Sequence, residues 1–293
     1  MQEPVVSAII TVYNNEQTVA DAIESFLGQT FRNLEIIVVD DGSTDGTRQL
    51  IEQRYGGQVR TVRQTNRGSA AARNAGVRSA RGEYVAFMDG DDISLPERVR
   101  LQVRVLEQRP EVGLVYGNIY LMEAARRELR LRRGIGRYKS GHVWHDLVIK
   151  NFVPFSTIMV RRECLHDIGL FDESIRSSED WHLLVRLARR CEFFYLDEPL
   201  VQYRIHAHSK TANLEEKERA FKRVQAKIFA ENDFGADGKR LRRLSDASLQ
   251  FGLLGIGLRY GHYGKALRYG LRGLFTTPGI LLYYRHEIFS RLR

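Results

Sequence analysis

Short apolar runs alternate with amphipathic stretches along the first third of the chain. The apolar runs are rich in β-branched side chains and predict buried strands at residues 5–13, 34–39, 58–64 and 83–88. The stretches between them favour helices, through apolar residues at helical spacing or through alanine, at residues 16–29, 46–55 and 68–80. This alternation predicts right-handed crossovers and a mainly parallel sheet, the architecture of an α/β protein.

Polar residues follow three of the predicted strands directly. They are residues 11–15, 40–43 and 89–92, with the sequences TVYNN, DDGS and DGDD. In a parallel sheet, ligands bind beyond the carboxyl ends of the strands, so we expect these clusters to line a crevice. The chain has neither a GxGxxG pattern nor a P-loop, so a dinucleotide fold or a P-loop does not explain that crevice.

Asp89 and Asp91 are two residues apart at the end of the fourth predicted strand. A D-x-D pair alone also fits a solvated acidic turn, but its place after a buried strand favours a metal site. The carboxylates would supply hard oxygen ligands to Mg²⁺ or Mn²⁺ and leave positions open for a diphosphate. Without a cation, this acidic wall would repel phosphate.

Composition sets further limits. The chain has 293 residues, 43% hydrophobic and 28% charged, as in a globular protein with one large domain or two small ones. No basic segment precedes an apolar core at the N-terminus, and no apolar run approaches the roughly 18 residues of a spanning helix. Two cysteines without metal-ligand spacing predict neither a disulfide framework nor a zinc site. We therefore expect a cytoplasmic protein.

Positive charge is concentrated near the C-terminus. Residues 239–293 hold eleven Lys and Arg against two acidic residues, which accounts for the whole formal net charge of +9. Such a segment points to an anionic partner, either a membrane surface or nucleic acid. No zinc finger, helix-turn-helix or interleaved aromatic and basic pattern supports the second, so we expect no nucleic-acid partner.

Several of these motifs occur together in one order. Residues 5–99 include VSAIITVYNNEQTVADAIESFLGQTFRNLEIIVVDDGSTDGT and NRGSAAARNAGVRSARGEYVAFMDGDDISLPERV, and a weaker match continues through FDESIRSSEDWHLLVRLA and EPLVQYRIHAHS to about residue 209. This pattern resembles the family 2 glycosyltransferases, which have the GT-A fold. The resemblance is specific for the family and much less specific for the sugar. It implies inverting transfer of a sugar from a nucleotide diphosphate donor.

The resemblance implies roles for five residues at the nucleotide. Thr11 and Tyr13 would hold the base, with Tyr13 stacking on it, and Asp41 would accept the imide N–H of uracil. Asn66 and Arg73 match positions of the nucleotide pocket, where Arg73 could place its guanidinium against base or phosphate. Thr11 and Asn66 could instead only close turns. UDP is accordingly the favoured nucleotide.

The other aspartates of the motifs are given different roles. Asp89 resembles the residue near ribose and metal, and Asp91 resembles the direct metal ligand. Asp92 could instead cap the following helix, and Asp40 is expected to be structural.

An inverting displacement needs a base that removes the proton of the acceptor hydroxyl. Glu179 and Asp180 begin an expected helix after a polar turn, where acidic residues also simply compensate the helix dipole. The family's Glu-Asp pair falls at this point in the order, which implies that Asp180 is the base and that Glu179 supports it or contacts the acceptor. Trp181 could be a platform for a sugar face or part of the core.

The segment YRIHAHS resembles the part of the family that closes over the donor diphosphate. Arg204 could neutralise charge on the leaving group, His206 could bind metal or a phosphate oxygen, and Ser209 belongs to the same donor site. A surface strand with incidental basic residues is the alternative. His208 departs from the usual polar or small spacer, so either histidine could face the site.

Two regions lie outside the strongest resemblance. The basic residues 125–139 fit a solvated hairpin or a clamp for an acceptor phosphate. From residue 212 the pattern turns helical, and residues 251–279 suggest a helical hairpin punctuated by Gly261 and Gly264 and ending near Pro278. Its arginines beside apolar residues suit an interfacial face, although packing on the catalytic domain or self-association would need the same apolar residues.

The sequence therefore predicts a GT-A domain at residues 1–210, with a nucleotide-sugar half at 1–120 and an acceptor half at 121–210, and a basic helical extension at 211–293. We expect a metal-dependent inverting glycosyltransferase with a UDP-sugar donor and a glycan or lipid-linked acceptor, active in cell-surface polysaccharide synthesis. It would be cytoplasmic, with peripheral contact to an anionic membrane. A polyprenyl-phosphate sugar synthase and a non-catalytic nucleotide-sugar-binding scaffold are the alternatives.

Overall fold

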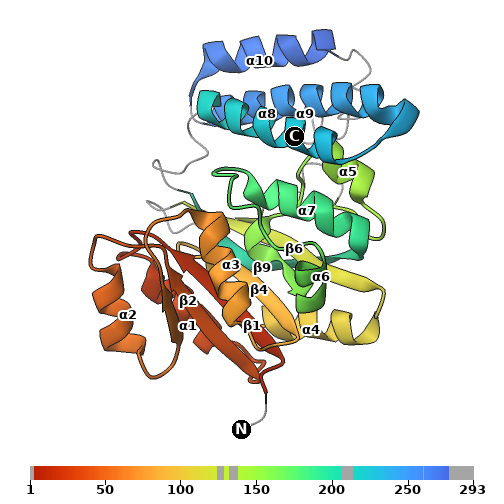
Figure 1. The fold of residues 1–293 in the computed structure, drawn as a ribbon. Helices are drawn as coiled ribbons and strands as arrows, with labels where there is room; N and C mark the ends of the chain where they lie inside the picture. Colours follow the sequence, from red (N-terminus) through yellow and green to blue (C-terminus); the bar gives the residue numbers. More distant parts are fainter. Residues whose placement is uncertain (1–2, 124–128, 132–137, 206–213, 260, 277–293) are drawn as a thin grey trace.

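The computed structural model describes residues 3–123, 129–131, 138–205, 214–259 and 261–276. A mixed sheet lies between two layers of helices, and three C-terminal helices stack beyond one of these layers (Figure 1).

Eight strands cross the sheet in the order β3-β2-β1-β4-β8-β6-β9-β5, and β7 pairs with β6. The first four in this order are mutually parallel, whereas β8 is antiparallel to both β4 and β6. The predicted mainly parallel sheet is confirmed. The strands are β1 (Val6–Val12), β2 (Leu34–Asp40), β3 (Arg60–Arg63), β4 (Tyr84–Asp89), β5 (Ile93–Ser94), β6 (Val112–Glu123), β7 (Leu129–Leu131), β8 (Met159–Arg161) and β9 (Glu192–Ile205).

The three helices predicted in the first part of the chain are present as α1, α2 and α3, each within three residues of its predicted bounds. Two short 3₁₀ helices, η1 (Phe155–Thr157) and η3 (Gly235–Asp237), complete the elements. The α-helices are α1 (Val19–Leu27), α2 (Thr47–Tyr55), α3 (Ser69–Ser79), α4 (Arg98–Gln108), α5 (Trp144–Ile149), α6 (Arg162–Asp167), α7 (Glu179–Arg190), α8 (Leu214–Glu231), α9 (Gly238–Arg259) and α10 (Tyr263–Thr276).

Successive side chains of the central strands point to opposite faces of the sheet, so each face has its own core. On one face, Ala8 and Ile10 of β1 pack in a cluster with α1, α2 and α4. On the other face, Ile9 packs in a cluster with α3, α5, α6 and α7. Both clusters are closed to water, and this fixes the register of the strands because a one-residue slip would exchange the faces.

The register brings the three polar clusters to one edge. Thr11 of β1 lies beside Val39 of β2 and Asp89 of β4, and Val12 lies beside Asp40. The carboxyl ends of the three strands therefore stop at the same level, as the sequence predicts.

The C-terminal helices α8 and α9 pack onto helices α5 and α7. Phe221 of α8 stacks on Trp181 of α7 with ring centroids 4.2 Å apart, and Phe234 stacks on Trp144 of α5 at 5.1 Å. Val224 of α8 and Leu241 of α9 belong to the same buried cluster as α7. The boundary predicted at residues 210–211 lies outside the described residues, so the division into domains and halves stays a prediction.

Helices α9 and α10 form the predicted hairpin. The turn between them contains Gly261, whose φ of 75° favours glycine. Gly264 does not interrupt a helix, because it lies in the first turn of α10, and Pro278 lies outside the described residues. No helix in the described parts of the chain is long and apolar enough to cross a bilayer.

The basic segment at residues 125–139 is described only in part. Its residues 129–131 form β7, which pairs antiparallel with β6 as in a hairpin, and the alternative of a clamp for an acceptor phosphate stays a prediction.

Candidate active site

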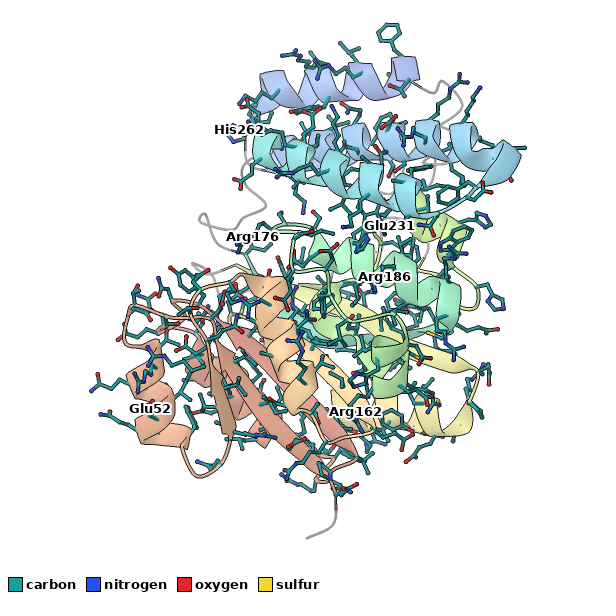
Figure 2. All side chains as sticks on the ribbon, in the orientation of Figure 1. Glu52, Arg162, Arg176, Arg186, Glu231 and His262 are labelled. Carbon is teal, nitrogen blue, oxygen red and sulfur yellow. The ribbon has the colours of Figure 1, made fainter. Side chains whose placement is uncertain are left out.

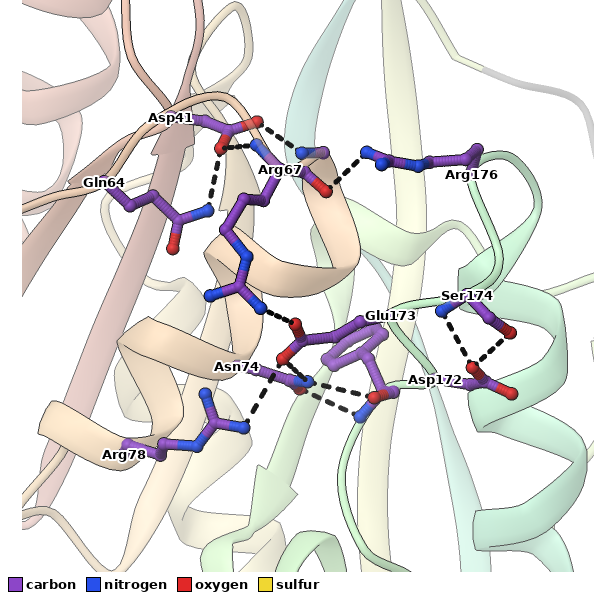
Figure 3. A network of polar contacts seen from close by, with 11 residues as sticks. Asp41, Gln64, Arg67, Asn74, Arg78, Asp172, Glu173, Ser174 and Arg176 are labelled. Atoms are coloured by element: carbon purple, nitrogen blue, oxygen red, sulfur yellow. Dashed lines mark hydrogen bonds and ion pairs between the residues drawn. The ribbon is translucent and has the colours of Figure 1, made fainter.

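Asp41 closes the turn that follows β2. Its Oδ1 accepts hydrogen bonds from Gln64 Nε2 at 2.7 Å and from the backbone N–H of Arg67 at 2.8 Å, and its Oδ2 accepts one from the N–H of Gly68 at 2.8 Å (Figure 3). A carboxylate has about four acceptor positions, so Oδ2 retains one for a further donor. The expected bond to a uracil imide stays a prediction, which this geometry permits.

Asp40 is buried beneath the same turn. Its Oδ1 accepts a hydrogen bond from the N–H of Ser43 at 2.8 Å, which fits its expected structural role. Gly42 has a φ of 78°, and a Cβ there would lie 2.8 Å from the backbone nitrogen of Asn66. Only glycine allows the two loops to approach this closely.

The other residues that are expected to contact the nucleobase lie around this turn. The side chain of Tyr13, just beyond β1, is 47% exposed, as a stacking platform must be. Thr11 lies within β1, and its carbonyl accepts a hydrogen bond from the N–H of Gly90 at 3.0 Å, while Asn66 is exposed. The structure thus places these residues together at the carboxyl edge of the parallel strands. Their contacts with a nucleobase stay predictions.

Three carboxylates crowd the loop after β4. Asp89 and Asp91 are partly exposed, whereas Asp92 is buried. Burial and the negative charges of Asp91 and Asp89 raise the pKa of Asp92 well above its ordinary value. Its Oδ1 accepts the backbone N–H of Arg204 at 3.1 Å, and its Oδ2 has no hydrogen-bond partner among the described residues.

The suggestion that Asp92 caps a helix is wrong. Strand β5 begins at the next residue, and α4 begins only at Arg98, with Glu97 at its N-cap. Asp92 instead lies under the acidic loop, where it holds the end of β9.

This donor set fits a divalent cation. Three carboxylates lie within four residues at a strand end, one buried oxygen lacks a hydrogen-bond partner among the described residues, and the mutual repulsion of the carboxylates would be relieved by a cation. Asp89 and Asp91 are exposed enough to meet a ligand. The third metal residue expected from the sequence, His206, lies outside the described residues.

Arg204 lies at the end of β9, against this loop. Its Nε donates to the carbonyl of Asp91 at 2.9 Å, and its Nη2 donates to Asp21 of α1 at 2.8 Å. These bonds hold Arg204 against the acidic loop and leave both interpretations of the residue open. Its contact with a diphosphate stays a prediction, and Ser209 and His208 lie outside the described residues.

Arg73 connects the acidic loop after β4 to helix α7, which carries Asp180, the expected catalytic base. Its guanidinium is 7% exposed and pairs with Asp89 at 2.8 Å and with Glu179 at 2.7 Å. The ring of Phe155 lies 4.2 Å from its central carbon, and Ser69 also donates to Glu179. Arg73 thus holds two carboxylates on different elements in fixed positions, which the sequence did not predict.

Asp180 occupies the first turn of α7, beside Glu179. The side-chain amide of Asn151 donates to its Oδ2 at 3.0 Å. Burial and the charge of Glu179 raise the pKa of Asp180, whereas the charges of Lys217 and Arg73 lower it. A carboxylate that is partly desolvated and held by one donor is well suited to accept a proton.

Sequence reasoning missed Asn151 and Lys217. Lys217 belongs to α8, and its Nζ donates to Ser178 Oγ at 3.3 Å, two residues before Asp180. No local pattern marks either residue, because the fold alone brings them to α7. Trp181, in contrast, is 1% exposed and donates to the carbonyl of Leu147 at 2.6 Å, so it belongs to the core and cannot face a sugar.

A second group of potential ligands lies between α7 and α8. Asp172, His182 and Glu231 have ligand atoms within 4.8 Å of one another. Lys227 pairs with Asp172 and lies 3.7 Å from Glu231, and His182 bonds to Glu231 at 2.8 Å. A lysine ammonium therefore balances these carboxylates, and the group joins the C-terminal helices to the catalytic part.

The parallel strands that end at one edge and the helices on both sides of the sheet are the architecture of the GT-A fold. The model of the family described as "Glycosyl transferase family 2" matches residues 7–169. The chain therefore belongs to glycosyltransferase family 2, and it is a transferase.

One relative is the "Uncharacterized glycosyltransferase RP339" of Rickettsia prowazekii (strain Madrid E), which is 30% identical over 253 residues, covering 84% of this chain and 79% of the relative. Among solved structures, S. aureus TarS 1-349 in complex with UDP-GlcNAc has a TM-score of 0.62 and 18% identity, covering 87% of this chain and 73% of that one.

Mannosyltransferase PcManGT from Pyrobaculum calidifontis, in complex with GDP-Man and Mn²⁺, has a TM-score of 0.61 and is 19% identical. The match covers 99% of this chain and 84% of that one. These two solved structures share the GT-A fold with this chain.

Proposed function

We propose that the protein is a metal-dependent inverting glycosyltransferase that transfers a sugar from a UDP-sugar to a glycan or lipid-linked acceptor in cell-surface polysaccharide synthesis. The observation that carries the proposal is the continuous link Asp89–Arg73–Glu179, which runs from the acidic loop to the residue next to Asp180. The complexes of two structural neighbours with UDP-GlcNAc, and with GDP-Man and Mn²⁺, support a nucleotide-sugar donor and a metal.

In this proposal each part of the site has one task. Asp41 and Tyr13 hold the nucleobase, and Asp89 and Asp91 would hold Mg²⁺ or Mn²⁺, which would supply positive charge beside the leaving diphosphate. Asp180 accepts the proton of the acceptor hydroxyl as the hydroxyl oxygen attacks the anomeric carbon from the face opposite the diphosphate. Because a lipid-linked acceptor lies in a bilayer, we also place the enzyme at the cytoplasmic face of a membrane.

The variant Asp180→Asn, which replaces the carboxylate by an amide of the same shape, tests whether Asp180 is the catalytic base. If Asp180 acts only on the acceptor proton, kcat falls by roughly 10²-fold or more while the affinity for UDP stays near that of the parent protein. Nucleotide release from a panel of nucleotide sugars with Mn²⁺ gives the rate, and calorimetry gives the affinity.

Asp167→Asn is the matched control, because Asp167 is an exposed aspartate on α6 that pairs with Arg190. It should leave both quantities unchanged. A loss of UDP affinity with unchanged turnover in Asp180→Asn would make Asp180 a donor-site residue and refute its role as the base.

A further inference from the structure

Helix α10 has three distinct faces. The first packs on α9 through the buried residues Ala266, Tyr269, Gly270 and Gly273. A Cβ at Gly273 would lie 2.9 Å from the ring of Phe251, so the absence of a side chain allows the two helices to approach closely. Figure 1 shows that α10 is the outermost helix, beyond α8 and α9.

The second face is an exposed apolar stripe, formed by residues that follow one another at every fourth position. These are Tyr263, Leu267, Leu271 and Phe275, with exposed fractions of 69%, 65%, 48% and 84%. Single exposed hydrophobic residues are ordinary, but a contiguous row of them on one helix marks an interaction surface. Figure 2 shows side chains of α10 projecting away from the rest of the molecule.

The third face is basic. Lys265, Arg268 and Arg272 are exposed, and α10 contains no acidic residue. They lie beside the stripe, because positions three and four apart share one side of a helix. Arg268 and Leu271, for example, are three residues apart. Apolar and cationic side chains in neighbouring rows are typical of helices that lie in the interface of a membrane.

Two other occupants of the stripe are less compatible with these charges. A second copy of the chain, docked through the same stripe, would bring two rows of arginine together, and like charges across an interface oppose association. The other possible occupant is the segment 277–293 of the same chain. It carries three arginines against one glutamate, so its net charge is also positive and would repel the basic face of α10. An anionic lipid surface complements both the charge and the apolar row.

We propose that the α10 stripe, together with Arg268 and Arg272, docks on the surface of an anionic lipid bilayer. The 14 described residues of α10 span about 21 Å and include three cationic side chains, so this segment would lie in the interface rather than in the hydrocarbon core. The inference goes beyond the proposed catalytic function, since it depends on no donor, metal or acceptor.

Polar contacts through α8 connect α10 to α7, the helix that carries Asp180. Lys265 of α10 pairs with Glu215 in the first turn of α8 at 2.9 Å. Lys217 in the same turn of α8 donates to Ser178, just before Asp180. The first turns of α10, α8 and α7 therefore lie on one side of the molecule, so docking would fix the orientation of α7, which carries Asp180, relative to the bilayer.

Vesicle flotation of the full chain tests the inference. We expect binding to vesicles of phosphatidylcholine and phosphatidylglycerol in equal parts, weaker binding at high salt, and none to phosphatidylcholine alone. Leu267→Ser combined with Leu271→Ser should weaken binding by about tenfold or more, because two apolar side chains leave the interface. Arg268→Gln and Arg272→Gln should each weaken it by about fivefold.

Leu131→Ser is the matched control, because Leu131 of β7 is 46% exposed and lies outside α10. It should bind vesicles like the parent protein, and all variants should keep the parent's thermal melting and donor hydrolysis in solution. If the serine pair unfolds the chain, the two arginine variants give an independent answer.

Three results would overturn the inference. The first is that the parent protein ignores anionic vesicles at low salt. The second is that it binds neutral vesicles equally. The third is that the stripe variants convert a dimer to a monomer in sedimentation without changing vesicle binding, which would make the stripe an interface between copies.

Discussion

Replacing Arg73 by methionine removes the charge that joins the acidic loop to α7. Arg73 is 7% exposed and its partner Glu179 is 8% exposed, so the variant leaves the carboxylate of Glu179 buried without its cation. Asp89 is 39% exposed and can be solvated instead. Methionine keeps an unbranched side chain of similar length, and the charge that it removes is the guanidinium, whose central carbon lies 4.2 Å from the ring centroid of Phe155 and 5.7 Å from that of Phe171.

The size of the effect follows from the burial of the pair. Removing one partner of a buried ion pair typically costs about 3–5 kcal/mol, because the remaining charge loses its compensation. The exposed pair with Asp89 adds little, since solvent screens it. We therefore expect Arg73→Met to lower the free energy of unfolding by about 3–5 kcal/mol.

A double-mutant cycle separates the ion pair from simple loss of packing. Glu179→Gln alone should cost about 1–3 kcal/mol, and in the double variant it should cost much less, because no buried charge then remains unpaired. Urea unfolding followed by circular dichroism measures all four proteins. A loss below about 1 kcal/mol in Arg73→Met, or additive losses in the cycle, would refute the view that Glu179 depends on Arg73.

Two further predictions concern the site. UDP binding measured by calorimetry should require Mn²⁺ or Mg²⁺, and Asp91→Ala should abolish turnover; equal UDP affinity in EDTA and in Mn²⁺ would contradict the metal assignment. Lys217→Met should move the acidic limb of the kcat–pH profile to higher pH, because the Lys217 charge lowers the pKa of Asp180 and a protonated base cannot accept the acceptor proton. In Lys217→Arg the acidic limb should return to the pH of the parent protein. If the acidic limb of Lys217→Met lies at the same pH as that of the parent protein, Lys217 has no electrostatic role.

The nucleotide side of the fold is predictable because its signals are local. Each of the first strands is an apolar run that ends at polar residues, and parallel pairing then brings those ends to one edge. Asp41 and Asp89 could therefore be placed at a common site without any knowledge of side-chain contacts. The turn at Gly42 belongs to the same class of signal, since a glycine after two aspartates marks a sharp bend.

The surroundings of Asp180 were harder to predict because their contacts join distant parts of the chain. Asn151, in the loop after α5, donates to Asp180, and Lys217 of α8 donates to Ser178 just before it; neither residue stands in a motif. The helical spacing around Trp181 did contain a usable signal. Leu184 and Ala188 follow it at helical intervals on the buried side of α7, which indicates a core position rather than a sugar platform.

The three C-terminal helices use their basic and apolar residues in different ways, and this decides how they must be tested. Leu241 of α9 is buried in the same cluster as the catalytic helix, so deleting the chain from residue 239 onward would open that core. Leu267 and Phe275 of α10 contact no such cluster and are 65% and 84% exposed. A truncation would therefore confuse loss of folding with loss of membrane binding, whereas substitutions confined to α10 change the outer surface alone.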